Sequence, residues 1–185
     1  GHWITKNYRE AYNIFGCNGI LFNHESPRRG ETFVTKKIIR GLVRIKFGLD
    51  KKLFLGNLDA KRDWGHAKDY VEAMWKILQQ KKPEDYVIAT GKQYSIRVFT
   101  NIVCKKLGFD ISWKGKGINE KGFINSGKKT IIEIDKNYFR PLDVNTLLGN
   151  ANKARKKLKW KPKYDLYSLI DEMISEEIKF INENQ

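Results

Sequence analysis

The residues best suited to chemistry lie in a short polar stretch, 23–30, which follows an apolar run of strand length, 17–22. This stretch contains His24, Arg28 and Arg29, and a guanidinium can hold a phosphate by two parallel hydrogen bonds. Because ligands of open α/β sheets sit beyond the carboxyl ends of strands, these side chains are in a position to bind one. Two structural alternatives stay open: His24 could satisfy carbonyl groups of its loop, and Arg28 could point to solvent.

Metal chemistry has little support in the sequence. Cys17 and Cys104 are the only cysteines, and neither has a second Cys or a His nearby at metal-ligand spacing. The three histidines (His2, His24 and His66) are scattered through the chain. We therefore expect no metal site and interpret both cysteines as small buried hydrophobic residues.

The charge of the chain is strongly unbalanced, with 36 Lys+Arg against 21 Asp+Glu and a formal net charge of +15. Such an excess attracts polyanions, which include nucleic acid and nucleotide diphosphates. The lysines concentrate at 36–52, 113–130 and 150–163, where solvated helix faces and a flexible loop would account for them. Aromatic residues do not alternate with these lysines in a single-strand-binding pattern, so we expect no nucleic acid partner.

The composition is that of a globular protein, with 41% hydrophobic residues in 185. No stretch approaches the roughly 20 apolar residues that a membrane span needs. The first residues contain no apolar signal-peptide region. The sequence therefore predicts a cytoplasmic protein without a membrane partner.

Helical and strand-like patterns alternate along the chain, which predicts an α/β fold. The helices are expected at 3–14, 33–47, 67–81, 95–107, 150–158 and 165–182. The strands are expected at 17–22, 52–56, 85–90 and 130–134, and the Gly- and Lys-rich segment 114–129 is predicted to be a mobile loop. Ser95 is a plausible N-cap, and the clearest helix carries Val71, Met74, Trp75 and Leu78 on one face.

The phosphate-binding turn of a dinucleotide-binding fold is missing from this sequence. No Gly-x-Gly-x-x-Gly-like stretch follows a strand near the start, and the chain begins inside a predicted helix. These features indicate a truncated chain. We expect such a chain to expose a sheet edge and the apolar face of its first helix, which invites aggregation.

The segment 18–35, NGILFNHESPRRGETFVT, closely resembles the signature of GDP-mannose 4,6-dehydratases, which belong to the extended short-chain dehydrogenase/reductase superfamily. Sugar-nucleotide epimerases of that superfamily usually have an Asn-x-x-Gly-Pro form here. The dehydratases differ by the His-Glu-Ser-Pro-Arg-Arg-Gly form seen at 24–30. Further stretches similar to the family lie at 3–10, 55–70, 138–141, 147–149 and 159–162.

The resemblance implies the C-terminal portion of an NADP-dependent enzyme that removes water from GDP-mannose. Its product would be GDP-4-keto-6-deoxymannose, a precursor of GDP-fucose and GDP-rhamnose, and its full-length form would be a dimer or tetramer. The family's catalytic Thr and Glu and its Tyr-x-x-x-Lys pair precede the residue that matches Trp3. We therefore assign no catalytic residue, and Tyr8, Tyr12 and Tyr70 do not replace the missing tyrosine.

The resemblance also implies roles for individual residues. His24 and Arg29 would bind NADP. In the same way Asn23 would hold the nucleotide-sugar, and Lys37 would contact the GDP portion, although an exposed helix lysine is the structural alternative for Lys37.

Three further positions would contact the substrate by the same resemblance. Arg62 would bind the GDP portion, and Arg140 would bind the substrate. The family usually has a Glu three positions after this second arginine, where this chain has Asp143, whose carboxylate is one methylene shorter. We expect Asp143 to lie at the GDP pocket nonetheless.

The expected fold class is thus the C-terminal part of an NAD(P)-binding Rossmann-fold enzyme with a smaller α/β substrate-binding lobe. Residues 1–32 and 67–94 are assigned to the Rossmann part, and 33–66 and 95–185 to the substrate lobe. Two alternatives are another sugar-nucleotide reductase or epimerase of the superfamily and a non-catalytic basic module that binds nucleic acid. Segment 24–30 argues against the first, and binding to random DNA that collapses with salt would indicate the second.

Overall fold

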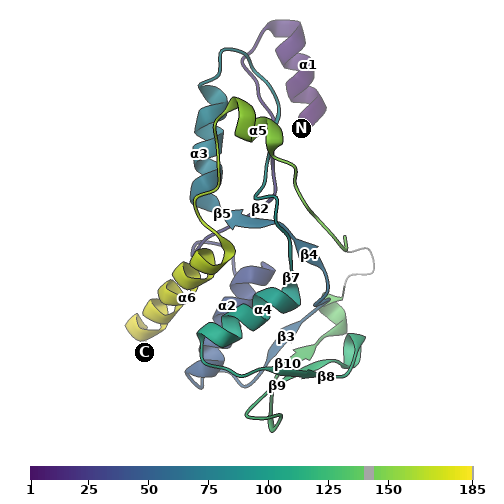
Figure 1. The fold of residues 1–185 in the computed structure, drawn as a ribbon, viewed down its shortest axis with the longest axis vertical. Coiled ribbons are helices and arrows are strands. Elements are labelled where there is room, and N and C mark those ends of the chain that lie inside the picture. The colour runs from purple at the N-terminus through teal and green to yellow at the C-terminus, as the bar shows by residue number, and fades with distance from the viewer. Residues whose placement is uncertain (140–143, 185) are drawn as a thin grey trace. The chain divides into compact units, whose positions relative to one another are not determined.

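The structure, a computed structural model, describes residues 1–139 and 144–184 of the chain (Figure 1). The chain forms two compact units, and both mix helices with strands, as the α/β prediction requires. Unit 1 comprises Gly1–Glu25, Asp63–Gln93 and Leu148–Leu166. Unit 2 comprises Ser26–Arg62, Tyr94–Leu147 and Tyr167–Gln185.

Unit 1 is built around two pairs of parallel strands. Its elements are α1 (His2–Tyr12), β1 (Gly19–Leu21), β2 (Asn23–Glu25), β5 (Trp64–His66), α3 (Ala67–Leu78), β6 (Tyr86–Ile88) and α5 (Asn152–Lys157). Strand β1 pairs with β6, and β2 pairs with β5 so that His24 lies opposite Gly65. The first residues of the predicted polar loop, Asn23–Glu25, therefore form a strand, because their backbone pairs in parallel with β5.

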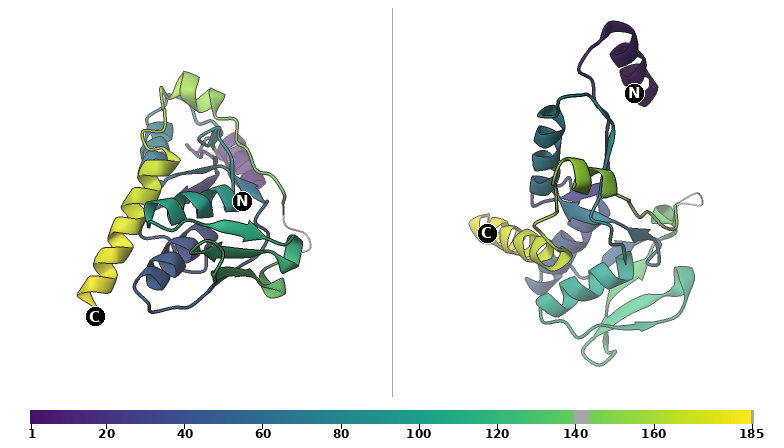
Figure 2. Two further views of the ribbon diagram at one scale, coloured as in Figure 1. Left: turned by 60° about the horizontal axis from the view of Figure 1, so that its bottom comes forward. Right: turned by 45° about the horizontal axis from the view of Figure 1, so that its top comes forward.

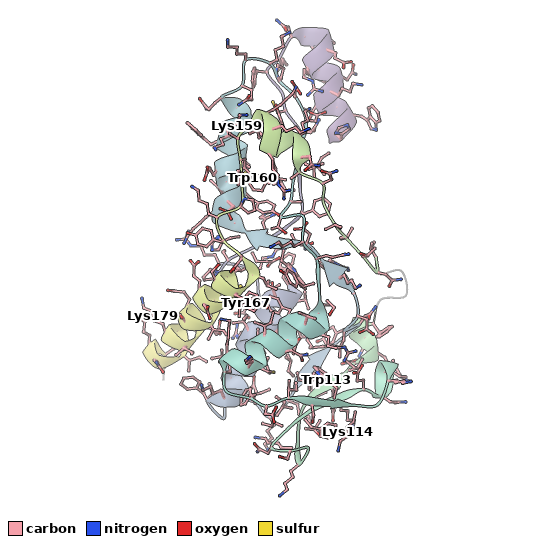
Figure 3. All side chains as sticks on the ribbon, viewed as in Figure 1. Trp113, Lys114, Lys159, Trp160, Tyr167 and Lys179 are labelled. Carbon is pink, nitrogen blue, oxygen red and sulfur yellow. The ribbon has the colours of Figure 1, made fainter. Side chains whose placement is uncertain are left out.

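The core of unit 1 lies between α3, β6 and the segment around α5. Tyr70 and Ala73 of α3, Ile88 of β6 and Trp160 are fully buried in it. The indole Nε1 of Trp160 donates a hydrogen bond to the main-chain oxygen of Asp69 at 2.8 Å, and the indole lies beside α3 (Figure 3). These contacts place 148–166 in unit 1, whereas the sequence analysis placed all of 95–185 in the other lobe.

The apolar face that periodicity indicates on α3 is not the face that the helix buries. Val71 and Trp75 are 62% and 61% exposed, whereas Asp69, Tyr70, Ala73 and Ile77 are buried. The buried face includes an aspartate because its carboxylate accepts hydrogen bonds from the main-chain N–H groups of Lys163 and Tyr164. Helix α3 thus keeps an apolar surface that nothing among the described residues covers.

Helix α1 also presents apolar surface, as the sequence predicts. None of its residues is buried, and Trp3 is 74% exposed. Arg9 ties the helix to the rest of unit 1 through two hydrogen bonds to Asp85, at 2.7 and 3.2 Å. The main-chain N–H of Asn18 donates to the same carboxylate, and the hydrogen bonds from Arg9 hold the pKa of Asp85 well below its usual range.

Unit 2 contains a four-stranded sheet in the order β3-β10-β9-β8, labelled in Figure 1 and drawn from two further sides in Figure 2, with β10 parallel to β3 and antiparallel to β9. The strands of unit 2 as a whole are β3 (Leu53–Leu55), β4 (Lys61–Arg62), β7 (Tyr94–Ser95), β8 (Ser112–Lys114), β9 (Lys121–Ile124) and β10 (Lys129–Ile134). Its helices are α2 (Val34–Lys46), α4 (Ile96–Lys106) and α6 (Leu166–Glu183), with single 3-10 turns η1 (Gly117–Asn119) and η2 (Lys136–Tyr138).

The prediction that 114–129 is a loop is wrong. This segment contains η1 and β9, and β9 hydrogen-bonds to both β8 and β10. Glycines permit the compact turn before β9, since Gly115 and Gly117 have positive φ angles of 90° and 58°. The sheet therefore includes a strand, β9, in a segment whose glycine and lysine content is typical of a loop.

The core of unit 2 is formed by the apolar faces of its helices. Helix α2 buries Ile38, Ile39 and Leu42, and α4 buries Phe99 and Val103. Helices α2 and α4 contact each other. No helix in the described part of the chain is long and apolar enough to cross a membrane.

Candidate functional site

The first predicted site residues, Asn23 and His24, lie on β2 in unit 1 and are half-buried. The ring nitrogen Nδ1 of His24 lies 2.9 Å from the carbonyl oxygen of Phe22. The aromatic ring of Tyr70 stacks on the imidazole, with 5.0 Å between centroids and 28° between planes. Among the described residues, therefore, His24 does satisfy a nearby carbonyl, through its Nδ1 atom.

Arg29 lies in the turn that leads from β2 to α2, in unit 2. Its main-chain N–H donates to the carbonyl oxygen of Ser26 at 2.9 Å. Its guanidinium carbon lies 3.5 Å from the ring centroid of Phe33, the residue that precedes α2. The guanidinium therefore lies over the face of this ring in a cation–π contact.

Lys37 lies on the first turn of α2 and lines a cavity of about 260 Å³. Its ammonium group is 3.2 Å from the ring centroid of Tyr138. The cavity is also lined by Arg40, Arg44, Lys52, Glu31, Asp50, Gly41, Leu53, Phe54 and Tyr138. Four cations against two carboxylates, beside two aromatic rings, suit an anionic ligand that carries an aromatic base.

Most of the cations around this cavity are already paired with carboxylates. Arg44 binds Asp50 at 2.6 Å and lowers the pKa of that carboxyl, and Arg40 forms an ion pair with Glu31. Lys52 binds Glu133 at 2.9 Å. Within the described residues Lys37 has no carboxylate partner, so it is the cation of this cavity that is available to a ligand.

The structure does not bring Arg62 into the Lys37 cavity. Arg62 lies on β4, where its Nη1 donates to the carbonyl oxygens of Lys61 and Val144 at 2.9 and 2.6 Å. Two other predicted residues, Arg140 and Asp143, lie outside the described residues.

Asp63 is a further important residue that the sequence analysis missed. Its carboxylate is fully buried in unit 1 and accepts hydrogen bonds from both N–H and hydroxyl of Thr90, at 2.9 and 2.6 Å. It also accepts from the N–H groups of Gly91, at 2.9 Å, and Gly149, at 3.3 Å. This carboxylate therefore joins three segments that are distant in the sequence.

Metal-ligand geometry is not found in the described part of the chain, where no group of three or more His, Cys, Asp or Glu side chains could hold an ion. Cys104 is buried, and burial raises the pKa of its thiol to about 12, so it behaves as an apolar residue. Cys17 is only half-buried.

Comparison with solved structures identifies the fold. A structure of RMD from Pseudomonas aeruginosa complexed with NADPH superposes with a TM-score of 0.76 at 17% identity, over 96% of this chain and 52% of that one. A dTDP-glucose 4,6-dehydratase from Bacillus anthracis in complex with NAD gives a TM-score of 0.75 at 19% identity, over 96% of this chain and 49% of that one. The chain therefore shares its fold with about half of each of these two proteins.

Comparison of sequences identifies the family. The family model described as GDP-mannose 4,6 dehydratase matches residues 1–173. The GDP-mannose 4,6 dehydratase of Dictyostelium discoideum is 53% identical over 180 residues, which cover 97% of this chain and 51% of the relative. The chain spans about half the length of the curated relatives it matches. On this evidence the chain belongs to the GDP-mannose 4,6-dehydratase family.

Proposed function

We propose that this chain is the C-terminal, nucleotide-sugar-binding part of an NADP-dependent GDP-mannose 4,6-dehydratase. The observation that carries the proposal is the 53% identity to a curated dehydratase across nearly the whole chain. The full-length protein is proposed to be a cytoplasmic homo-oligomer. Unit 1 is then part of the cofactor domain and unit 2 is the substrate lobe. The chain alone is proposed to be inactive, because no acid, base or nucleophile is assigned in it.

His24 of unit 1 and Arg29 of unit 2 are each proposed to contact the dinucleotide. His24 offers a hydrogen-bonding nitrogen beside a strand end, and Arg29 offers a guanidinium supported by the ring of Phe33. NADP, when bound, supplies the acceptor for hydride from sugar C4 and returns that hydride at C6. The part of these residues is to bind and orient the dinucleotide.

The proposed substrate contact with the clearest structural support is that of Lys37. Its ammonium group lines the cation-rich cavity. Of the four cations around that cavity, Lys37 is the one without a carboxylate partner among the described residues. A diphosphate requires such a cation, and the exposed ring of Phe54 in the same cavity offers a surface to a base. Asn23, Arg62, Arg140 and Asp143 are proposed to complete the contacts to GDP-mannose, as the family resemblance implies.

The proposed function can be tested by joining this chain to the part of the Dictyostelium discoideum relative that the match does not cover. We expect the joined protein to remove one water from GDP-mannose, which mass spectrometry of the product detects. A joined protein that binds NADP, leaves GDP-mannose intact and converts a UDP- or dTDP-sugar would contradict the proposal.

Lys37 provides the sharper variant in the same joined protein. Lys37→Met should raise the KM for GDP-mannose by roughly 10- to 100-fold, because a hydrogen bond to a charged group contributes about 1.5 to 3 kcal/mol. The kcat should change little, since the diphosphate is bound equally before and during the reaction. Lys105→Met, on an exposed position of α4, is the matched control and should leave KM unchanged. Equal KM values for the two variants would remove Lys37 from the substrate site.

A further inference from the structure

The hydrogen bond of His24 determines which of its nitrogens can meet a ligand. Nδ1 lies 2.9 Å from the carbonyl oxygen of Phe22, and a carbonyl oxygen can only accept a hydrogen bond. Nδ1 therefore carries the proton. In the neutral imidazole the other nitrogen, Nε2, then has a lone pair and is an acceptor.

The ring of Tyr70 covers one face of this imidazole and is itself held in place. Tyr70 is fully buried, and Trp160 packs edge-on against it with 6.3 Å between ring centroids. Gly65, which lies opposite His24 on β5, leaves the space for the ring. A Cβ atom at this glycine would lie 2.5 Å from Cε2 of Tyr70 and 2.9 Å from a methyl carbon of Thr90, so neither side chain could keep its position.

The hydroxyl group of Tyr70 makes no hydrogen bond to His24 or to any other described residue, although it is buried. Burial raises the pKa of Tyr70 well above its usual value, with Asp63, Asp69 and Glu25 adding to the effect, so the phenol stays neutral. The contribution of Tyr70 to its surroundings is therefore the flat face of its ring.

We propose that Tyr70 is a positioning residue for His24, and that the Nε2 atom which it orients accepts a hydrogen bond from the cofactor. The donor is a hydroxyl or N–H group of the dinucleotide and not one of its phosphates, because an ionised phosphate has no proton to donate to the lone pair of Nε2. The inference rests on the proposed function for the contact between His24 and NADP. The stacking, the proton on Nδ1 and the need for Gly65 stand independently of that contact.

The proton position can be measured directly in the chain without any ligand. The sequence has three histidines, so long-range ¹H–¹⁵N correlation spectra of the imidazoles resolve His24 with a His24→Gln variant for assignment. We expect the pattern of a ring with its proton on Nδ1. A ring of His24 with its proton on Nε2, or an equal mixture of both forms, would overturn the inference even if the proposed function holds.

Two variants of Tyr70 separate the ring from the hydroxyl. Tyr70→Phe should preserve the His24 pattern, because the stacked face remains. Tyr70→Leu and Gly65→Ala should both convert the pattern to a mixture of the two forms. In NADP titrations Tyr70→Leu should weaken binding by up to roughly tenfold, the effect of losing one aromatic pair. Tyr70→Phe remains informative if Tyr70→Leu does not fold, because loss of the pattern on removing only the hydroxyl would overturn the role of the ring.

Fragments of the cofactor identify the group that His24 meets. A nucleoside-containing fragment, nicotinamide mononucleotide or 2′,5′-ADP, should shift the Nε2 signal of His24, and inorganic phosphate should not. A shift with inorganic phosphate alone would overturn the proposed donor. In the joined protein described above, a ring with its proton on Nδ1 that responds to neither fragment nor to intact NADP would instead refute the proposed contact of His24 with the cofactor.

Discussion

Replacing Asp63 by asparagine is expected to lower the free energy of unfolding by about 2 to 5 kcal/mol, because hydrogen bonds to a charged group contribute about 1.5 to 3 kcal/mol each and a buried donor left without an acceptor costs about 1 to 3 kcal/mol. The carboxylate is fully buried and accepts four hydrogen bonds, from Thr90 (two), Gly91 and Gly149. Asparagine has one acceptor oxygen, and its NH₂ group would face donors. At least one buried N–H group is then left without an acceptor.

Denaturant unfolding of the chain, followed by tryptophan fluorescence, measures this loss. Glu10→Gln is the control, because it removes a carboxylate whose side chain is 64% exposed and whose ion pair with Lys6 is long, at 3.8 Å. We expect that control to change the stability by less than about 1 kcal/mol. A similar small change in Asp63→Asn would show that the carboxylate does not hold the three segments together.

Replacing Trp160 by alanine should have an effect of comparable size, about 3 to 5 kcal/mol. Its indole is fully buried in unit 1, packs against Tyr70 and donates to the main-chain oxygen of Asp69 at 2.8 Å. Removal of the indole creates a cavity and leaves that oxygen without this donor. Because the segment around Trp160 packs against α3, its loss weakens the attachment of 148–166 to unit 1.

Trp75→Ala provides a matched tryptophan in the same unit. Its side chain is 61% exposed on α3, so we expect the free energy of unfolding to change by less than about 1 kcal/mol. Trp160→Phe should fall between the two, since it keeps most of the apolar volume and loses the hydrogen bond. Equal losses in Trp75→Ala and Trp160→Ala would contradict the described core.

Local signals predicted most of the elements. Ser95 is an N-cap, as predicted, because its hydroxyl accepts from the N–H of Val98 at 3.1 Å. The helix predicted at 33–47 is observed as Val34–Lys46, and the strand predicted at 130–134 as Lys129–Ile134. Caps, glycine stops and apolar periods act over a few residues, so the sequence alone reveals them.

Features that depend on distant segments were not predictable in the same way. Strand β9 is stabilised by pairing with β8 and β10, and its composition of glycine and lysine resembles a loop. The buried face of α3 was missed because Asp69 becomes buried only when the N–H groups of Lys163 and Tyr164 reach it. Both outcomes depend on partners outside the segment itself, which local composition does not show.

The candidate site likewise combines residues that the sequence could locate with residues whose roles depend on distant segments. The family resemblance locates His24 and Lys37 in the sequence, and the structure shows each with a defined environment, one stacked on Tyr70 and the other in a cation-rich cavity. The roles of Asp63 and Tyr70 follow from contacts with residues far along the chain, for which one sequence holds no signal.

The central claim, that this chain binds the GDP portion of a nucleotide-sugar, is tested most directly by calorimetric titration with GDP-mannose, GDP and UDP-glucose. Moderate salt is needed because a chain with a net charge of +15 binds anions non-specifically at low ionic strength. The account predicts saturable binding of GDP-mannose and GDP and much weaker binding of UDP-glucose. Equal affinity for UDP-glucose, or a folded chain that binds none of the three, would contradict it.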